Sequence, residues 1–313
     1  MRLLQESRPQ KVLLGIALIV GSVFLMSFGD ALVKSVSSDF TLWQLYVVRS
    51  LVAVPLILVL LRVVARNAVL RPASVGWTLL RSLLLTGMWI GYYAALPRLS
   101  LAVAATAVYS APLFIAVFSA LLIGEPVGMR RWLAVGIGFF GVLAILRPGT
   151  EAFSLVTLLP LLSAVFYASA MVITRSKCAD DHPLSLSLAL NLTLLVAGLG
   201  ASGVIALWGS QDPAVYPFLL GDWAPLALRD WAVLALLAVL LVAFSVGTAK
   251  AYQSGPPVII ATFDYAYLAF AALWGLLLFA DLPDAWTVVG MVLIAGAGLL
   301  AIRPTAKHRT RAF

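Results

Sequence analysis

The sequence predicts an all-α integral membrane protein with ten transmembrane helices, arranged as two five-helix halves that enter the membrane from opposite sides. Three observations predict this class: an apolar composition, a sided distribution of Lys and Arg, and an internal repeat. Hydrophobic residues make up 63% of the 313 residues and charged residues only 11%, whereas ordinary soluble domains carry about 25% charged residues. So few charges cannot cover a surface exposed to water, and we therefore expect lipid to be the main solvent.

The apolar segments have the length that a membrane crossing requires, about 20 residues for a helix. Turns rich in Pro and Gly separate several of them, as at 124–128 and 254–257. The first segment follows a basic N-terminus but is too long for the apolar region of a signal peptide, so we expect it to be retained. The expected spans are 12–33, 41–61, 77–97, 101–123, 130–147, 155–173, 184–207, 231–253, 257–280 and 286–302.

The basic residues predict the orientation, because loops on the cytoplasmic side of a membrane carry an excess of Lys and Arg. With both termini in the cytoplasm, most of the 21 Lys and Arg residues fall on the cytoplasmic side, in clusters near 62–71, 130–131, 175–177 and 303–311. Both termini can share one side only if the number of crossings is even. The net charge of +8 is explained by this topology and needs no nucleic-acid partner.

An internal repeat divides the chain into two halves, 1–150 and 151–313. Residues 105–109 read ATAVY and residues 261–265 read ATFDY, at corresponding positions of the two halves. In each half an acidic residue also precedes an Arg-Pro pair at the same spacing: Glu125 before Arg147, and Asp281 before Arg303.

Five crossings in each half are an odd number, so the second half must be inverted relative to the first. Inverted repeats are typical of secondary transporters, whose solute site lies near the midplane where the repeats meet. We therefore predict alternating access around one central cavity. An intramembrane enzyme or a sensor is the alternative from a different class.

Two motifs give the chain a resemblance to the EamA-type members of the drug/metabolite transporter superfamily. An acidic residue and a proline follow the fourth and ninth spans, and a glycine-rich span that ends in Arg-Pro comes next. These motifs are Gly124-Glu125-Pro126 with Gly136, Gly138 and Gly141, and Asp281-Leu282-Pro283 with Gly290, Gly296 and Gly298. The second copy has Asp281 where the first has Gly-Glu. Nearly the whole chain takes part in the resemblance.

The resemblance implies a carrier in the bacterial inner membrane. Within the superfamily the chain is most similar to amino-acid exporters of the YddG type, which implies outward transport of aromatic or other neutral amino acids. A drug, a sugar phosphate or a nucleotide sugar is the alternative solute. The partners then implied are the small-molecule substrate and the lipid bilayer, for a chain that is a monomer or a weak homodimer.

Ionisable residues inside spans are costly, so they usually face a cavity or a partner. Lys250 and Asp264 flank the turn 254–257 on adjacent helices, at depths that lysine's length can bridge. We expect them to pair with each other, or with the carboxylate and the ammonium of a zwitterionic solute. Snorkelling to the cytoplasmic rim is the alternative for Lys250. Arg49 also needs a partner, for which Asp30 has a suitable depth.

Aromatic side chains suit the walls of a largely apolar small-molecule pocket. Trp89 and Tyr93 are four residues apart and so share a helix face. Tyr109 and Tyr265 occupy equivalent positions of the repeat. We expect these four residues to line the substrate site, with Asn191 as a further polar candidate.

The sequence gives no signal for an enzyme or a cofactor. It has no phosphate-binding loop of the Walker type and no Cys/His cluster with the spacing of a metal site. ATP is therefore not the expected direct energy source. Proton coupling, which would run most simply through the deep carboxyl of Asp264, and facilitated exchange both stay open.

Overall fold

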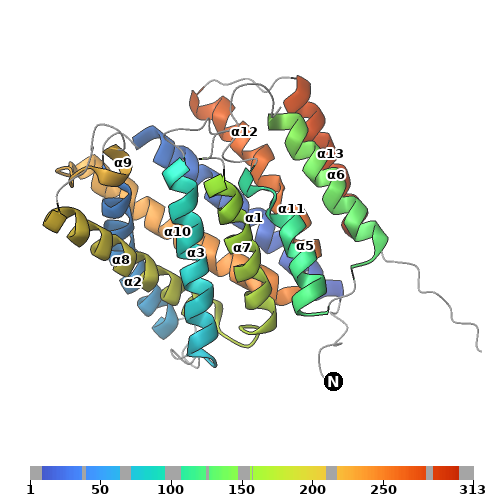
Figure 1. Cartoon of the computed structure of the whole chain (residues 1–313), viewed down its shortest axis with the longest axis horizontal. Helices are drawn as coiled ribbons and strands as arrows, with labels where there is room; N and C mark the ends of the chain where they lie inside the picture. The colour runs from blue at the N-terminus through green and yellow to red at the C-terminus, as the bar shows by residue number, and fades with distance from the viewer. Residues whose placement is uncertain are drawn as a thin grey trace, which may run out of the picture.

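The computed structural model is a bundle of helices (Figure 1), and it describes residues 9–36, 40–63, 72–95, 107–124, 127–146, 156, 158–208, 217–279 and 285–302. The acidic turn residues Glu125 and Asp281 and the Arg-Pro pairs of the repeat lie outside these residues. No strand occurs in the described part of the chain. The helices are α1 Pro9–Val36, α2 Leu42–Val63, α3 Val75–Ala95, α5 Ala111–Leu122, α6 Met129–Leu146, α7 Leu158–Ser176, α8 Pro183–Trp208, α9 Pro217–Leu220, α10 Leu228–Ser254, α11 Pro257–Asp264, α12 Ala266–Phe279 and α13 Ala285–Ile302.

Six segments of the described chain are long and apolar enough to cross a membrane. They are α1, α2, α7, α8, α10 and the run Pro257–Leu278 that joins α11 to α12. The predicted all-α membrane class is therefore confirmed. Many Leu and Val side chains lie exposed on the outside of the bundle, as expected for helices whose outer surface contacts lipid, where each helix satisfies its own backbone hydrogen bonds.

Proline fixes where several helices begin, because its ring sets a helical φ and the first helical N–H needs no partner. The predicted turn at 254–257 is present: α10 ends at Ser254 and α11 begins at Pro257. At its other end α10 starts with a local cap, in which Ala227 N–H donates to the Asp230 carboxylate over 2.8 Å. Helix α11 ends at Asp264, and Tyr265 separates it from α12.

The main helix pairings are α6 with α13, α1 with α10, α3 with α7, and α2 with α8. In Figure 1, α6 and α13 lie side by side at one end of the bundle and α2 and α8 lie at the other. Helices α1, α3, α7, α10, α11 and α12 lie between them and contribute to the main buried cluster. The polar residues described next come from several of these central helices and from α2.

Candidate functional site

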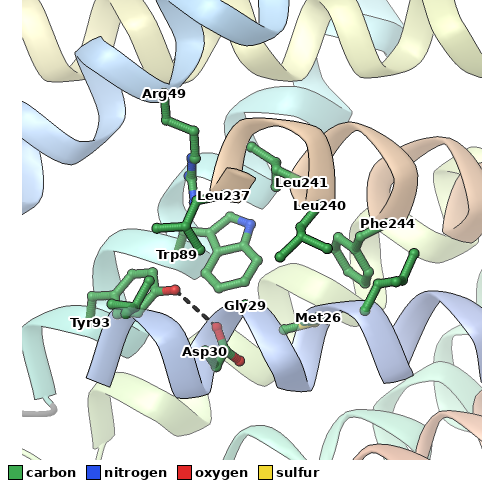
Figure 2. A pocket seen from close by; sticks show the side chains of 12 residues that line it. Met26, Gly29, Asp30, Arg49, Trp89, Tyr93, Leu237, Leu240, Leu241 and Phe244 are labelled. Atoms are coloured by element: carbon green, nitrogen blue, oxygen red, sulfur yellow. Dashed lines mark hydrogen bonds between the residues drawn. The ribbon is translucent and has the colours of Figure 1, made fainter. Parts of the chain in front are cut away.

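A small cavity lies between α1, α2, α3 and α10, near the middle of the bundle (Figure 2). Its volume is about 30 Å³, which is close to the share of one water molecule in liquid water. Apolar side chains form most of the wall, together with two charged residues. The lining residues are Leu25, Met26, Gly29, Asp30, Val33, Arg49, Trp89, Tyr93, Leu237, Leu240, Leu241 and Phe244.

Arg49 brings a buried cation to this cavity from α2. The residue is only 3% exposed, and its side chain reaches toward Trp89 (Figure 2). Its Nε and Nη2 atoms have no hydrogen-bond partner among the described residues, and the ring of Tyr46 lies 5.5 Å from the guanidinium carbon. An arginine that holds hydrogen-bond donors unused inside a bundle is costly. Arg49 is therefore suited to an anionic group that enters the cavity.

Asp30 provides the opposite charge from α1. The hydroxyl of Tyr93 donates to its Oδ1 over 3.1 Å, and the hydroxyl of Tyr267 donates to its Oδ2 over 2.8 Å. Each carboxylate oxygen thus accepts one hydrogen bond, and the Asp30 carboxylate is also attracted by the charge of Arg49. The cavity consequently offers a cation and an anion within reach of one small solute.

Three aromatic residues, Trp89, Tyr93 and Phe244, form part of the cavity wall. Trp89 stacks on Tyr93, with ring centroids 5.3 Å apart and an interplanar angle of 16°. Phe244 meets Trp89 edge-on at 6.5 Å. The prediction that Trp89 and Tyr93 share a helix face is confirmed, and both line the cavity.

A second, still smaller space of about 10 Å³ lies on the other side of Trp89 and Phe244, which line both. Its polar lining includes Arg81, Tyr167 and Thr248. The Arg81 Nε donates to the Thr174 hydroxyl over 2.6 Å. Trp89 and Phe244 therefore form a partition between two spaces, each with one buried arginine.

Asp264 lies at the end of α11 and lines neither space, although its partner Tyr167 lines the second one. Its Oδ2 accepts two hydrogen bonds, from the Tyr167 hydroxyl over 2.7 Å and from the Tyr252 hydroxyl over 3.0 Å. It is 5% exposed. Tyr109 stacks on Tyr267 at 4.8 Å, and its hydroxyl interacts electrostatically with both Asp264 and Asp30. A belt of tyrosines thus extends between the two carboxyls.

The structure does not bring Lys250 to Asp264. Lys250 is exposed, and its charge acts on the nearby His182 in the loop after α7, where burial and then Lys250 lower the histidine pKa. The expected Lys250–Asp264 pair is therefore absent from the described residues: Lys250 is exposed, whereas Asp264 is buried and accepts hydrogen bonds from two tyrosines. The alternative of a lysine at the rim agrees with this position.

The other expected lining residues lie apart from the cavity. Tyr265 is fully buried and packs against Gly138 of α6, where an added Cβ would overlap its ring. Asn191 is a buried residue of α8, and its Nδ2 donates to the Ser187 carbonyl of the same helix over 2.9 Å. Equivalent repeat positions therefore do not have equivalent surroundings here, since Tyr109 lies in the tyrosine belt.

The expected substrate-binding set omitted Asp30, Arg49, Tyr267 and Phe244. The sequence does signal Asp30 and Arg49, because both are ionisable residues inside expected spans. Tyr267 and Phe244 carry no such signal, since aromatic residues that face lipid or the core look the same in a sequence.

Comparisons with known proteins agree with a carrier. Residues 13–147 match the EamA-like transporter family. The pseudopaline exporter CntI of Pseudomonas aeruginosa is 28% identical over 94% of this chain and 97% of its own length. A riboflavin transporter of Vibrio cholerae is 28% identical over 78% of this chain and 76% of its own. An S-adenosylmethionine uptake transporter of Rickettsia felis is 26% identical over 65% of this chain and 63% of its own length.

One solved crystal structure has the same fold, with a TM-score of 0.72 over 94% of this chain and 99% of that chain at 19% identity. The protein is therefore a multi-pass protein of the inner membrane, and its first half, residues 13–147, is similar to the EamA-like transporter family.

Proposed function

We propose that the protein is a secondary transporter that exports neutral amino acids, preferably those with an aromatic or other apolar side chain. The observation that carries the proposal is the buried Arg49, whose unused hydrogen-bond donors face a cavity that also contains Asp30. The sequence suggested that Lys250 binds the solute carboxylate. In this proposal Arg49 has that role instead. The solute carboxylate binds Arg49, and its ammonium binds Asp30.

The walls of the cavity suit the remainder of such a solute. Trp89, Tyr93 and Phe244 offer ring faces and edges, which bind apolar and aromatic groups well. A planar guanidinium also fits a carboxylate with two parallel hydrogen bonds. A phosphorylated sugar would need more cations than the one arginine in this cavity, which makes a drug or a sugar phosphate the weaker candidate.

Transport needs movement, because a cavity of about 30 Å³ is far smaller than the pockets of several hundred Å³ that hold small organic ligands. The solute must displace Tyr93 and Tyr267 from Asp30 to bind there. Helices α11 and α12 meet at Tyr265, whose carbonyl accepts the Leu268 N–H over 3.1 Å. This break lets the two segments tilt separately, and we infer alternating access around it.

The helix pairings support the proposed five-plus-five inverted repeat, and the distribution of Lys and Arg supports a cytoplasmic location for both termini. The contact of α1 with α10 has its counterpart in α7 with α3, and that of α1 with α12 in α7 with α5. The pairs α2 with α8 and α6 with α13 each join equivalent helices. This is the pattern expected when a two-fold axis in the membrane plane relates two halves.

The topology can be tested with single cysteines in a Cys178→Ser background. A cysteine placed after Leu146 and another after Ile302 are labelled in intact cells with a membrane-impermeant maleimide. We expect opposite sides of the membrane. Labelling of both from the same side would end the inverted repeat.

The names of the relatives support a small organic solute, since they are an exporter of pseudopaline and transporters of riboflavin and S-adenosylmethionine. An intramembrane enzyme or a sensor stays the different-class alternative. Flux of radiolabelled amino acids into proteoliposomes of the purified chain separates these functions. We expect counterflow with phenylalanine and other neutral amino acids. Turnover of the solute without flux would favour the enzyme. The absence of both turnover and flux would favour a sensor.

A further inference from the structure

We propose that Asp264 is a proton-carrying site, separate from the solute site, which makes the transporter an antiporter of protons and amino acids. This inference rests on the proposed function for its solute, but its evidence is the geometry around Asp264. The carboxyl of Asp30, which is half-buried, and that of Asp264, which is buried, have different surroundings, and the difference indicates different tasks.

The hydrogen bonds of Asp30 are those of a carboxylate. Its two oxygens each accept one tyrosine hydroxyl, and the Arg49 cation acts on it across the cavity. Both oxygens are thus engaged, and a positive charge balances the negative one. This carboxyl is arranged to remain ionised and to attract an ammonium group.

Asp264 is arranged differently. Tyr167 and Tyr252 both donate to Oδ2, while Oδ1 has no hydrogen-bond partner among the described residues. In a carboxylic acid, the carbonyl oxygen accepts hydrogen bonds and the other oxygen carries the proton. With both donors on Oδ2, the oxygen Oδ1 is left free to take up and release a proton.

No cation balances Asp264 in the described part of the chain. The groups that act on its carboxyl are the hydroxyls of Tyr167 and Tyr252, and it in turn acts on Tyr109 and Tyr265. The nearest link to a cation is indirect, through the attraction of Arg81 for Tyr167. An ionised carboxyl inside a bundle without a cation costs several kcal/mol, as a rule.

The helices that pack against α11 carry few charged residues inside the bundle. These helices are α1, α5, α6, α7, α10 and α13, and α5 and α13 contain no charged residue. Apart from Asp30, the charged residues of the others lie within about one turn of a helix end: Lys11, Lys34, Arg130, Arg131, Arg175, Arg229, Asp230 and Lys250.

The α11–α12 segment connects the proton site to the solute site. Asp264 ends α11, and Tyr267, which holds Asp30, lies in the first turn of α12. Because only Tyr265 separates the two helices, a solute that displaces Tyr267 from Asp30 and tilts α12 also shifts the end of α11, where Asp264 lies. The Asp264 acid then gives its proton to water on one side and takes one from water on the other, so that one proton enters for each solute that leaves.

Infrared difference spectroscopy of the purified full-length protein tests the proton site without any solute. The carbonyl stretch of a protonated carboxyl should appear in the wild type and be lost in Asp264→Asn. Asp30→Asn is the matched control and should retain it. Tyr252→Phe should shift the band, because it removes one of the two hydrogen bonds to the acid. An equal band in Asp264→Asn overturns the proposal.

Flux of radiolabelled phenylalanine in proteoliposomes tests the coupling. An interior more acidic by one pH unit should drive about tenfold accumulation by the wild type, since one proton exchanged per solute transmits the whole gradient. Asp264→Asn should retain counterflow but accumulate no solute, whereas Asp30→Asn should lose both. Size-exclusion and circular dichroism confirm that each variant is folded.

The failures of the two proposals are distinguishable. Accumulation by Asp264→Asn, a wild type indifferent to pH, or a folded Asp264→Asn without counterflow would each overturn the proton site. Wild-type protein that shows no counterflow with any amino acid would overturn the proposed function instead, and the infrared band would still decide whether Asp264 carries a proton.

Discussion

Replacement of Arg49 by Gln tests the solute site most directly. The change removes a buried cation that has two unpartnered atoms, Nε and Nη2, while it keeps a polar side chain of moderate length. Hydrogen bonds to charged groups contribute about 1.5–3 kcal/mol each. The solute carboxylate can accept two such bonds from Arg49, but its removal from water offsets part of their binding free energy. We therefore expect Arg49→Gln to weaken phenylalanine binding by about 2–4 kcal/mol, which corresponds to about 30- to 1,000-fold in Kd.

The assay compares two ligands in detergent solution, with the change in intrinsic tryptophan fluorescence as the reporter of binding. Phenylalanine carries a carboxylate, and phenethylamine has the same ring and ammonium without it. Wild-type protein should prefer phenylalanine by the factor above, and Arg49→Gln should bind both ligands about equally. The variant Asp30→Asn supplies the converse control, since it should lose the preference for phenylalanine over 3-phenylpropanoate. If Arg49→Gln still preferred phenylalanine by the wild-type factor, Arg49 could not be the carboxylate site.

Three further predictions concern the aromatic wall, the helix packing and the thiol. Trp89→Phe should remove part of the stacking on Tyr93, worth about 0.5–1.5 kcal/mol, so phenylalanine should bind more weakly while the affinity for alanine changes little. Titration calorimetry measures both affinities. An equal loss of affinity for alanine would refute a contact between Trp89 and the solute ring. Gly198→Ala should lower the thermal unfolding temperature, because the added Cβ would lie 3.0 Å from the Trp43 carbonyl oxygen of the backbone, and overpacking costs about 1–3 kcal/mol. Gly200→Ala on the same helix is the control, since nothing lies within 4 Å of its Cβ; equal stability of the two variants would contradict the close packing. Burial raises the pKa of the Cys178 thiol, and thiolate is the reactive form, so maleimide should label Cys178 slowly at neutral pH and rapidly once the protein is unfolded. Rapid labelling of the folded protein would show that the loop after α7 leaves Cys178 accessible.

The sequence by itself determined the membrane class, because lipid exposure demands long apolar helices whatever their partners are. It also determined the turn before α11, where Pro and Gly act locally. The sharing of one helix face by Trp89 and Tyr93 follows in the same way from the helical period alone. These properties depend on composition, on local backbone chemistry or on residues only one turn apart.

Only the tertiary structure decided which intramembrane charges face one another. Lys250 and Asp264 lie on either side of one short turn in the sequence, yet in the folded bundle Lys250 is exposed and Asp264 accepts hydrogen bonds from two tyrosines. The partners of Asp30 come from α3 and α12, far away in the sequence. Helix rotation is set by the packing of many side chains at once. For that reason the sequence could nominate the charged residues, but only the packed bundle could match them to their partners.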